Sequence, residues 1–245
     1  MTHRFFTAHG VHRPTPCFPW CEEGYIAVLP TITYCRLTFD AADYHDRQFT
    51  RCRIPFPTWL SEMPAARKAD YLAGRYCARR ALMALGARVT DVGVSMGRVP
   101  CWPEGFIGSI SHSAGRAIAL ATNDVRIRHL GVDTERHQPE VMREIATMLA
   151  SHAEAQYIAR LPLAREWVLT LLFSAKESLF KALYPALRRD FDFMAAELTE
   201  LDPSGRRFTL RLTVTLSARL KTGDCFEGYF SEDGEHLTTL VVVRQ

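Results

Sequence analysis

The order of strand-like and helix-like segments predicts an α+β fold for this chain of 245 residues. Short apolar strands come first, helical segments occupy the middle, and strand-like runs close the sequence. Hydrophobic residues make up 47% and charged residues 23%, which is typical of a globular protein rather than a disordered one. This length allows one large domain or two small ones, and we expect two halves that meet near residues 115–125.

The first half is expected to contain several strands and one long helix. The helix is predicted over residues 65–85, where Ser61 can cap its start and Pro64 suits its first turn. Gly86 follows directly and favours the end of the helix. Apolar runs bounded by turn-forming residues predict strands at residues 24–29, 32–39, 106–112 and 116–122.

The second half is expected to place two helices between strands. A buried strand over residues 129–135 ends in acidic residues. Helices are predicted over residues 139–161 and 164–183, because a proline follows each of them. Alternating apolar residues and intervening turn sequences predict the closing strands at residues 207–215, 225–230 and 237–243.

Basic residues are concentrated in one part of the chain. The formal net charge is only +3, which argues against a general nucleic-acid binder. Residues 47–98 nevertheless contain ten basic residues and three acidic ones. All but four of the basic residues are arginines, whose guanidinium group suits phosphate better than the point charge of a lysine. No apolar run approaches the ~18 residues of a membrane span, so we expect none.

The cysteines indicate a reducing compartment. There are seven, an odd number scattered along the sequence, and the first residues lack the apolar core of a secretory signal. We therefore expect free thiols in a cytoplasmic protein. Cys17 and Cys21 lie near His9 and His12, but the spacing is not that of a zinc motif, so no zinc site is predicted there.

Two acidic residues end the strand over residues 129–135. Residues two apart in a strand point to the same side, so the carboxylates of Asp133 and Glu135 should share one face. Oxygen donors of this kind suit Mg²⁺, which recruits phosphate oxygens for its remaining positions. A solvated pair of acids at a strand end is the ordinary alternative.

The helix over residues 164–183 carries charged residues among apolar ones. Glu177 and Lys181 are four residues apart and therefore share a face, while Lys176 precedes Glu177 directly. A surface ion pair is the ordinary interpretation, but the surrounding leucines and phenylalanines indicate a largely buried helix. A third metal ligand and a proton donor would explain such charges.

Donors for a phosphate group are found in the first half. The sequence Gly-Ser-Ile-Ser-His-Ser at residues 108–113 places Ser111 and His112 at a strand end. Arg67 and Arg75 are eight residues apart on the predicted helix, about two turns, and Arg98 precedes a rigid proline-rich segment. Together these arginines offer three guanidinium groups to a polyphosphate. The sequence has no Walker A loop, no G-x-G-x-x-G, no H-E-x-x-H and no G-x-S-x-G.

Five motifs in order resemble the 4′-phosphopantetheinyl transferases, and among them the enterobactin-synthase component D type of the surfactin-type class. Three are the segments 108–113, 131–135 (Gly-Val-Asp-Thr-Glu) and 173–181 (Phe-Ser-Ala-Lys-Glu-Ser-Leu-Phe-Lys). The other two are 73–79 and 97–103, so that the resemblance covers residues 65–185. It implies two similar α+β halves in a pseudo-two-fold arrangement, with the active site in the cleft between them. The expected halves are residues 1–118, which would bind coenzyme A phosphates, and 119–245, which would carry the metal ligands and the catalytic helix.

The resemblance also implies a reaction and a role for each residue. The family transfers the 4′-phosphopantetheine arm of coenzyme A to a serine of an apo carrier protein, with Mg²⁺ or Mn²⁺, and releases 3′,5′-ADP. Asp133, Glu135 and Glu177 match the metal ligands. Glu177 is also the expected base, and Lys181 the residue that neutralises or protonates the leaving group. The residues that match coenzyme A-binding positions, or lie beside them, are Arg67, Arg75, Arg98, Ser111, His112, Lys176 and Lys181.

The resemblance implies coenzyme A and carrier-protein domains as partners, with peptidyl and aryl carriers of siderophore synthesis first and acyl carriers also open. A monomer is expected, with no nucleic-acid partner. Two other classes of function fit the residues more loosely. A metal-dependent phosphohydrolase would use the three acids without a carrier, and a non-catalytic coenzyme A-binding module would use the basic residues alone.

Overall fold

The computed structural model describes residues 5–95 and 99–245, and it confirms an α+β fold. The chain divides into two compact units, Met1–Arg126 and Ile127–Gln245. The boundary expected after residue 118 is wrong. It would cut through strand β7 (Arg116–Thr122), which pairs with β3 on one side and β6 on the other and so belongs to the first unit.

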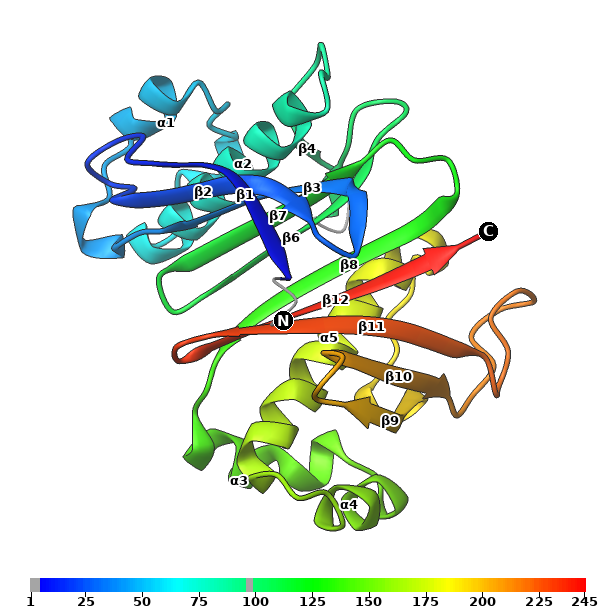
Figure 1. The fold of residues 1–245 in the computed structure, drawn as a ribbon. Coiled ribbons are helices and arrows are strands. Elements are labelled where there is room, and N and C mark those ends of the chain that lie inside the picture. The colour runs from blue at the N-terminus through cyan, green and yellow to red at the C-terminus, as the bar shows by residue number, and fades with distance from the viewer. Residues whose placement is uncertain (1–4, 96–98) are drawn as a thin grey trace. The chain divides into compact units, whose positions relative to one another are not determined.

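The first unit contains a five-stranded antiparallel sheet in the order β1-β2-β3-β7-β6. The helix α2 packs against β3, β6 and β7 (Figure 1). The bounds of the strands are β1 Phe6–His12, β2 Trp20–Ile26, β3 Leu29–Thr38, β6 Ile107–Ser113 and β7 Arg116–Thr122. A short hairpin of β4 (Gly93–Val94) and β5 (Pro100–Cys101) precedes β6, and a short helix α1 (Arg47–Cys52) precedes α2.

Helix α2 spans Ala65–Ala84, close to the predicted range. The expected cap is wrong, because Pro64 stands at the N-cap and Ser61 lies in the preceding 3₁₀ turn. The helix buries its small residues on the sheet. A Cβ on Gly74 would lie 2.8 Å from the Ile110 side chain, so glycine allows α2 to approach β6 closely.

The second unit also contains a five-stranded antiparallel sheet, in the order β8-β12-β11-β10-β9, with the long helix α5 against β8 and β12 (Figure 1). The strands are β8 Ile127–Arg136, β9 Ala196–Asp202, β10 Arg207–Leu212, β11 Cys225–Asp233 and β12 His236–Arg244. The helices are α3 Pro139–Leu149, α4 His152–Ala159 and α5 Arg165–Leu187.

Two helix predictions in this unit are corrected. The helix expected over residues 139–161 is broken in two, because Ser151 and Glu154 form a capping box that starts α4. Helix α5 does not stop before Pro185 but continues through it to Leu187, where Arg188 takes a left-handed conformation with φ 54°. Leu187 packs on the core and Tyr184 contacts the Phe180 ring, and these contacts hold the last turn although proline removes a hydrogen bond.

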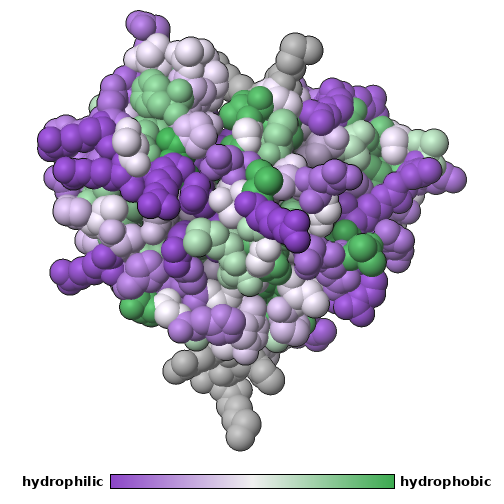
Figure 2. All heavy atoms as spheres, turned by 90° about the horizontal axis from the view of Figure 1, so that it is seen from above, coloured by the Kyte–Doolittle hydropathy of each residue, from purple (hydrophilic) through white to green (hydrophobic). Residues whose placement is uncertain are grey.

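Each unit has its own hydrophobic core, between its sheet and its long helix. Among the described residues, no helix is long and apolar enough to cross a membrane. On the face viewed in Figure 2, hydrophilic side chains cover most of the surface and surround small apolar groups.

Candidate functional site

The first group of predicted residues lies where α5 crosses β8. Gly131 makes this crossing close, since a Cβ there would lie 1.9 Å from the carbonyl oxygen of Ser178 on α5. Asp133 follows two residues later and therefore faces α5 as well. Its side chain is only 2% exposed, and its Oδ1 accepts a hydrogen bond of 2.6 Å from Nζ of Lys181.

Polar contacts between α5 and β12 fix the helix at this position. Ser174 and Ser178 lie one turn apart on α5, and both hydroxyls contact Oγ1 of Thr239, at 2.9 and 2.7 Å. The hydroxyl of Ser178 also lies 3.0 Å from the carbonyl oxygen of Thr239. Thr239 pairs with Asp133 across the two strands. These buried contacts therefore hold α5 in register with the strand residue that binds Lys181.

Glu177 is half-buried on the same helix and lies one turn before Lys181. Burial raises the pKa of its carboxyl group, the ammonium of Lys181 opposes that shift, and the charge of Asp133 adds to it. The carboxylates of Glu177 and Asp133 are therefore electrostatically coupled. Glu135 lies on the same face of β8 as Asp133, as the strand alternation predicts. We call Asp133, Glu135 and Glu177 the acidic set.

The acidic set supplies the carboxylate oxygens that Mg²⁺ prefers, and two of its members share one face of β8, so its chemistry fits this ion. Its oxygen atoms are not gathered around a point. Within the described parts of the chain, one group alone brings three potential ligand atoms within 4.8 Å of one another, and it is not the acidic set. In this structure the ammonium of Lys181 compensates the charge of Asp133 instead.

Lys176 lies elsewhere than expected. Its side chain is 2% exposed, and its ammonium donates to Glu154 Oε2 at 2.9 Å and to the carbonyl oxygens of Leu149 and Phe193 at 2.9 and 2.8 Å. Burial lowers its pKa, and the carboxylate of Glu154 opposes that effect. All three protons of the ammonium have acceptors inside the second unit. Lys176 is therefore part of the core of the second unit and does not lie beside Asp133 as Lys181 does.

The second group of predicted residues lies where α2 faces β6 in the first unit. Arg67 Nη1 donates to His112 Nε2 at 3.3 Å, and His112 Nδ1 lies 3.6 Å from Oδ1 of Asp70. This arrangement suits a neutral imidazole whose Nδ1 carries the proton. Asp70 thus orients the His112 ring so that Nε2 faces the guanidinium of Arg67. None of the sequence motifs pointed to Asp70.

Arg75 lies further along α2 and is 8% exposed. Its Nη2 donates to the carbonyl oxygen of Gly93 at 3.3 Å, and its guanidinium lies 4.7 Å from the ring centre of Tyr71. Burial lowers its pKa, the contact with Tyr71 opposes this effect, and the charge of Arg67 adds to it. Arg75 therefore holds the β4 segment while sharing the electrostatic environment of Arg67. We call Arg67, Arg75 and His112 the phosphate set.

Two other predicted phosphate ligands are not in this group. Ser111 precedes His112 in β6 and so points to the opposite face of the sheet, where it is 3% exposed. The structure therefore does not bring Ser111 and His112 together. Arg98 lies outside the described residues.

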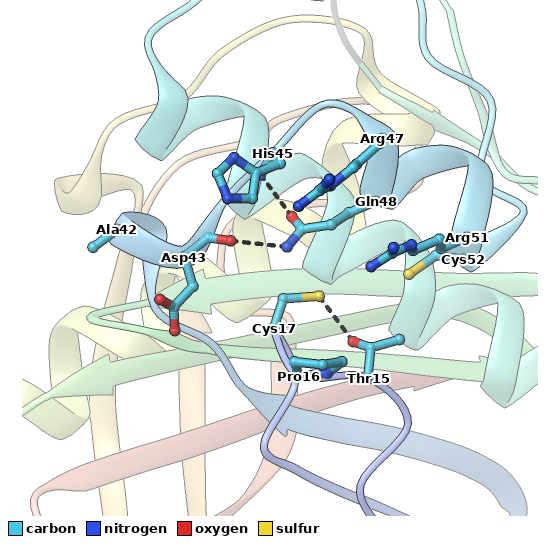
Figure 3. A pocket seen from close by; sticks show the side chains of 10 residues that line it. All are labelled: Thr15, Pro16, Cys17, Ala42, Asp43, His45, Arg47, Gln48, Arg51 and Cys52. Atoms are coloured by element: carbon cyan, nitrogen blue, oxygen red, sulfur yellow. Dashed lines mark hydrogen bonds between the residues drawn. The ribbon is translucent and has the colours of Figure 1, made fainter.

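A separate cavity of about 360 Å³ lies in the first unit, around α1 and the turn that precedes β2 (Figure 3). None of the predicted site residues lines it. Thr15 Oγ1 and Cys17 Sγ lie 2.8 Å apart at its edge. Hydrogen bonding with Cys52 lowers the pKa of the Cys17 thiol to about 6 against the opposing effect of burial, and Thr15 contributes to the shift.

Two family models match this chain in succession. The model for the 4′-phosphopantetheinyl transferase N-terminal domain matches residues 57–122, which contain the phosphate set. The model for the 4′-phosphopantetheinyl transferase superfamily matches residues 129–238, which contain the acidic set and Lys181. The gap between the two matches includes the boundary between the two units.

Several characterised proteins are similar over much of the chain. Enterobactin synthase component D of Salmonella typhi is 31% identical over 204 residues, which cover 83% of this chain and 82% of that protein. The 4′-phosphopantetheinyl transferase PptT of Mycobacterium tuberculosis is 32% identical and matches 63% of this chain and 69% of its own length. The 4′-phosphopantetheinyl transferase Svp of Streptomyces mobaraensis is 36% identical over 59% of both chains.

Proposed function

Because the chain belongs to the 4′-phosphopantetheinyl transferase superfamily, we propose that its two sets of site residues act on the same coenzyme A molecule. The chain is a 4′-phosphopantetheinyl transferase, which transfers the phosphopantetheine arm of coenzyme A to a carrier protein. The observation that carries the assignment is the buried Asp133, bound by Lys181 and electrostatically coupled to Glu177.

Asp133, Glu135 and Glu177 are proposed to hold the divalent metal that is typical of the family, and Mg²⁺ suits their oxygen donors. Bound there, Mg²⁺ would neutralise charge on the pyrophosphate. Lys181 stabilises the carboxylate of Asp133 in this structure. Exchange of Mg²⁺ for Mn²⁺ in the assay tests the choice of ion.

In the proposed transfer, the serine hydroxyl of the carrier forms a bond to the β-phosphorus of coenzyme A. The bond between that phosphorus and the oxygen of the leaving 3′,5′-ADP breaks, and the electron pair stays on that oxygen. Glu177 accepts the serine proton, a role that suits a carboxylate whose pKa is raised by burial. Lys181 lies one turn away and is proposed to neutralise or protonate the departing oxygen.

The phosphate set is proposed to bind the phosphates of coenzyme A. His112 Nε2 accepts from Nη1 of Arg67 and so orients the guanidinium, whose other N–H groups are the donors proposed for the phosphate. Arg75 is proposed to position the β4 segment through its bond to Gly93. Arg98 is also proposed to bind a phosphate, and the support for this is its place in the motif at residues 97–103.

The carrier is proposed to be an apo peptidyl or aryl carrier domain of siderophore synthesis. The support is the similarity to the enterobactin synthase components D, because that name denotes part of a siderophore synthase. A monomeric enzyme in the cytoplasm is also proposed. Its seven cysteines are all free thiols, and each unit of the chain has its own core. Light scattering of the purified protein tests the monomer.

The deciding experiment is transfer to apo carriers followed by mass spectrometry. Purified protein with coenzyme A and Mg²⁺ should raise the carrier mass by one phosphopantetheine, first for peptidyl and aryl carriers. Glu177→Gln should greatly slow the increase, whereas the variant Glu144→Gln, which changes an exposed acid on α3, should retain it. Absence of product with every carrier would overturn the proposed acceptor, while full activity of Glu177→Gln would remove only Glu177 from its role.

A further inference from the structure

Three side chains of different chemistry converge on the first two strands of the first unit. His12, Cys21 and Glu23 each bring one potential metal-ligand atom within 4.8 Å of the other two. Within residues 5–95 and 99–245, no other His, Cys, Asp and Glu side chains form such a group. A thiol, an imidazole and a carboxylate are the three ligand types that protein zinc sites use.

The strand register explains why these residues meet. His12 of β1 pairs directly with Cys21 of β2, so their side chains lie on the same face of the sheet. Glu23 is two residues beyond Cys21 and shares that face. An irregularity between Ala8 and Gly10 changes the β1 register by one residue, and this bulge sets the face on which His12 lies.

The distances approach those of a tetrahedral zinc site. Bonds of about 2.0 Å to nitrogen and oxygen and about 2.3 Å to sulfur place N and O ligands about 3.3 Å apart, and S and O ligands about 3.5 Å apart. His12 Nε2 and Glu23 Oε1 are separated by 3.3 Å, and Cys21 Sγ and Glu23 Oε1 by 4.0 Å. The third pair, His12 and Cys21, has its ligand atoms within 4.8 Å of each other, so Cys21 must move toward Glu23 for the ligands to reach tetrahedral spacing.

A second layer of contacts holds the carboxylate in place. Arg80 of α2 donates to Glu23 Oε1 at 2.8 Å and orients it from the side of the helix. Metal-binding carboxylates are commonly held by such hydrogen bonds. His12 has a side chain that is 37% exposed, whereas Cys21 is fully buried, so the group has a deep ligand and a side open to solvent.

We propose that His12, Cys21 and Glu23 bind one Zn²⁺ ion, with water in the fourth position. Bound there, the ion would join β1 to β2 at the edge of the sheet, within the first unit. This zinc site shares no residue with the acidic set. Binding replaces the S–H bond of Cys21 by an S–Zn bond, and the thiol proton leaves to water.

The thiol is the energetic obstacle to this site. The hydrogen bond with Cys35 and burial both raise the pKa of Cys21, so the metal must displace a proton that the metal-free protein holds firmly. Cys21 Sγ lies 3.5 Å from Sγ of Cys35 and 4.0 Å from Oε1 of Glu23, so the thiol proton has an acceptor in either direction. Zn²⁺ would replace that proton and bind both Cys21 and Glu23.

Cobalt substitution tests the proposal without measuring transfer activity. The full-length protein, freed of transition metal and kept in excess Mg²⁺, is titrated with Co²⁺. One equivalent should produce a thiolate-to-cobalt charge-transfer band and visible bands of tetrahedral intensity, and Zn²⁺ should displace both. The oxygen ligands of the acidic set cannot produce a thiolate band, so failure of the proposed transfer function would leave this readout unaffected.

Variants assign the ligands. Cys21→Ser should abolish the charge-transfer band, and His12→Ala, at a partly exposed position that tolerates change, should abolish saturable binding. Cys101→Ser and His9→Ala, which change exposed residues of the same unit, should retain the band. Absence of the band in the wild-type protein, or its persistence in both Cys21→Ser and His12→Ala, would overturn the proposal.

Discussion

Two lysines five residues apart on α5 have opposite environments. Lys181 lies at the sheet surface beside Asp133, with 26% of its side chain exposed, whereas Lys176 is enclosed with Glu154. Removing one partner of a buried ion pair leaves an uncompensated charge, which costs about 3–5 kcal/mol. We therefore expect Lys176→Met to lower the free energy of unfolding by about this amount in urea titrations.

The same variant separates a structural role from substrate binding. Enzyme that remains folded should keep its KM for coenzyme A, because the ammonium of Lys176 has only internal partners. Lys221→Met, at an exposed lysine in the same unit, is the control and should change neither quantity. A raised KM for coenzyme A with an unchanged free energy of unfolding would show that Lys176 binds coenzyme A.

Cys17 offers a pH-dependent reaction at a single residue. Its pKa is lowered from the ordinary value of 9.0 to about 6, chiefly by the contact with Cys52. Since the thiolate is the reactive form, alkylation of Cys17 by iodoacetamide should rise with pH through about 6 and level off near neutrality. Peptide mass spectrometry measures this rate.

The control for this measurement is Cys52→Ala. Loss of its hydrogen bond should move the midpoint of Cys17 alkylation to higher pH, because the remaining influence of burial raises the pKa. A wild-type midpoint near 9, the ordinary thiol value, would contradict the assigned environment.

At the scale of elements, the approach of α5 to β8 depends on one missing side chain. A Cβ at Gly131 would meet the carbonyl oxygen of Ser178 at 1.9 Å and the backbone nitrogen of Ala182 at 2.7 Å. Backbone atoms cannot turn away as a side chain can, so Gly131→Ala should push the helix off the strand. We expect a loss of about 1–3 kcal/mol or more in unfolding free energy, and lower transfer activity because Lys181 moves away from Asp133.

The matched control is Gly10→Ala, at a position where a Cβ would meet nothing within 4 Å. It should leave thermal stability close to that of the wild type. Equal behaviour of the two variants in a thermal melt would show that the close crossing of α5 and β8 has no energetic importance.

The sequence predicted those helices and strands whose ends are marked by neighbouring residues. The range of α2 follows from Pro64 and Gly86, and the strands β6 and β7 from short apolar runs. The break between α3 and α4 was also readable, since Ser151 and Glu154 have the spacing of a capping box. The passage of α5 through Pro185 was not, because packing of the surrounding residues overrides the local preference of proline.

In the candidate site, too, the sequence predicted arrangements within one strand or helix but not contacts between elements distant in the sequence. Strand alternation correctly placed Asp133 and Glu135 on one face, and helical spacing placed Glu177 beside Lys181. The burial of Lys176 in an ion pair could not be predicted, because its partner Glu154 lies 22 residues away on another helix. The spacing of His12 and Cys21 predicted no zinc site, and the group proposed above includes Glu23 only through the β1–β2 register.

At the scale of the whole molecule, the residue types are divided between the two units. The phosphate set of the first unit has no carboxylate among its members, while the acidic set and Lys181 lie in the second. If both sets act on one coenzyme A molecule, they should contribute to different kinetic parameters. Contacts to phosphate that persist through the reaction affect KM, and the base acts only in the transition state.

Arg67→Ala should therefore raise KM for coenzyme A roughly tenfold or more, as expected for loss of a charge-assisted hydrogen bond, and should largely preserve kcat. Glu177→Gln should lower kcat with little effect on KM. Arg88→Ala, at an exposed arginine of the first unit, controls for the loss of basic charge alone. Steady-state transfer kinetics with saturating carrier measure all three. A fall in kcat without a change in KM for Arg67→Ala would contradict this role, because it would mean that the Arg67 contact forms only in the transition state.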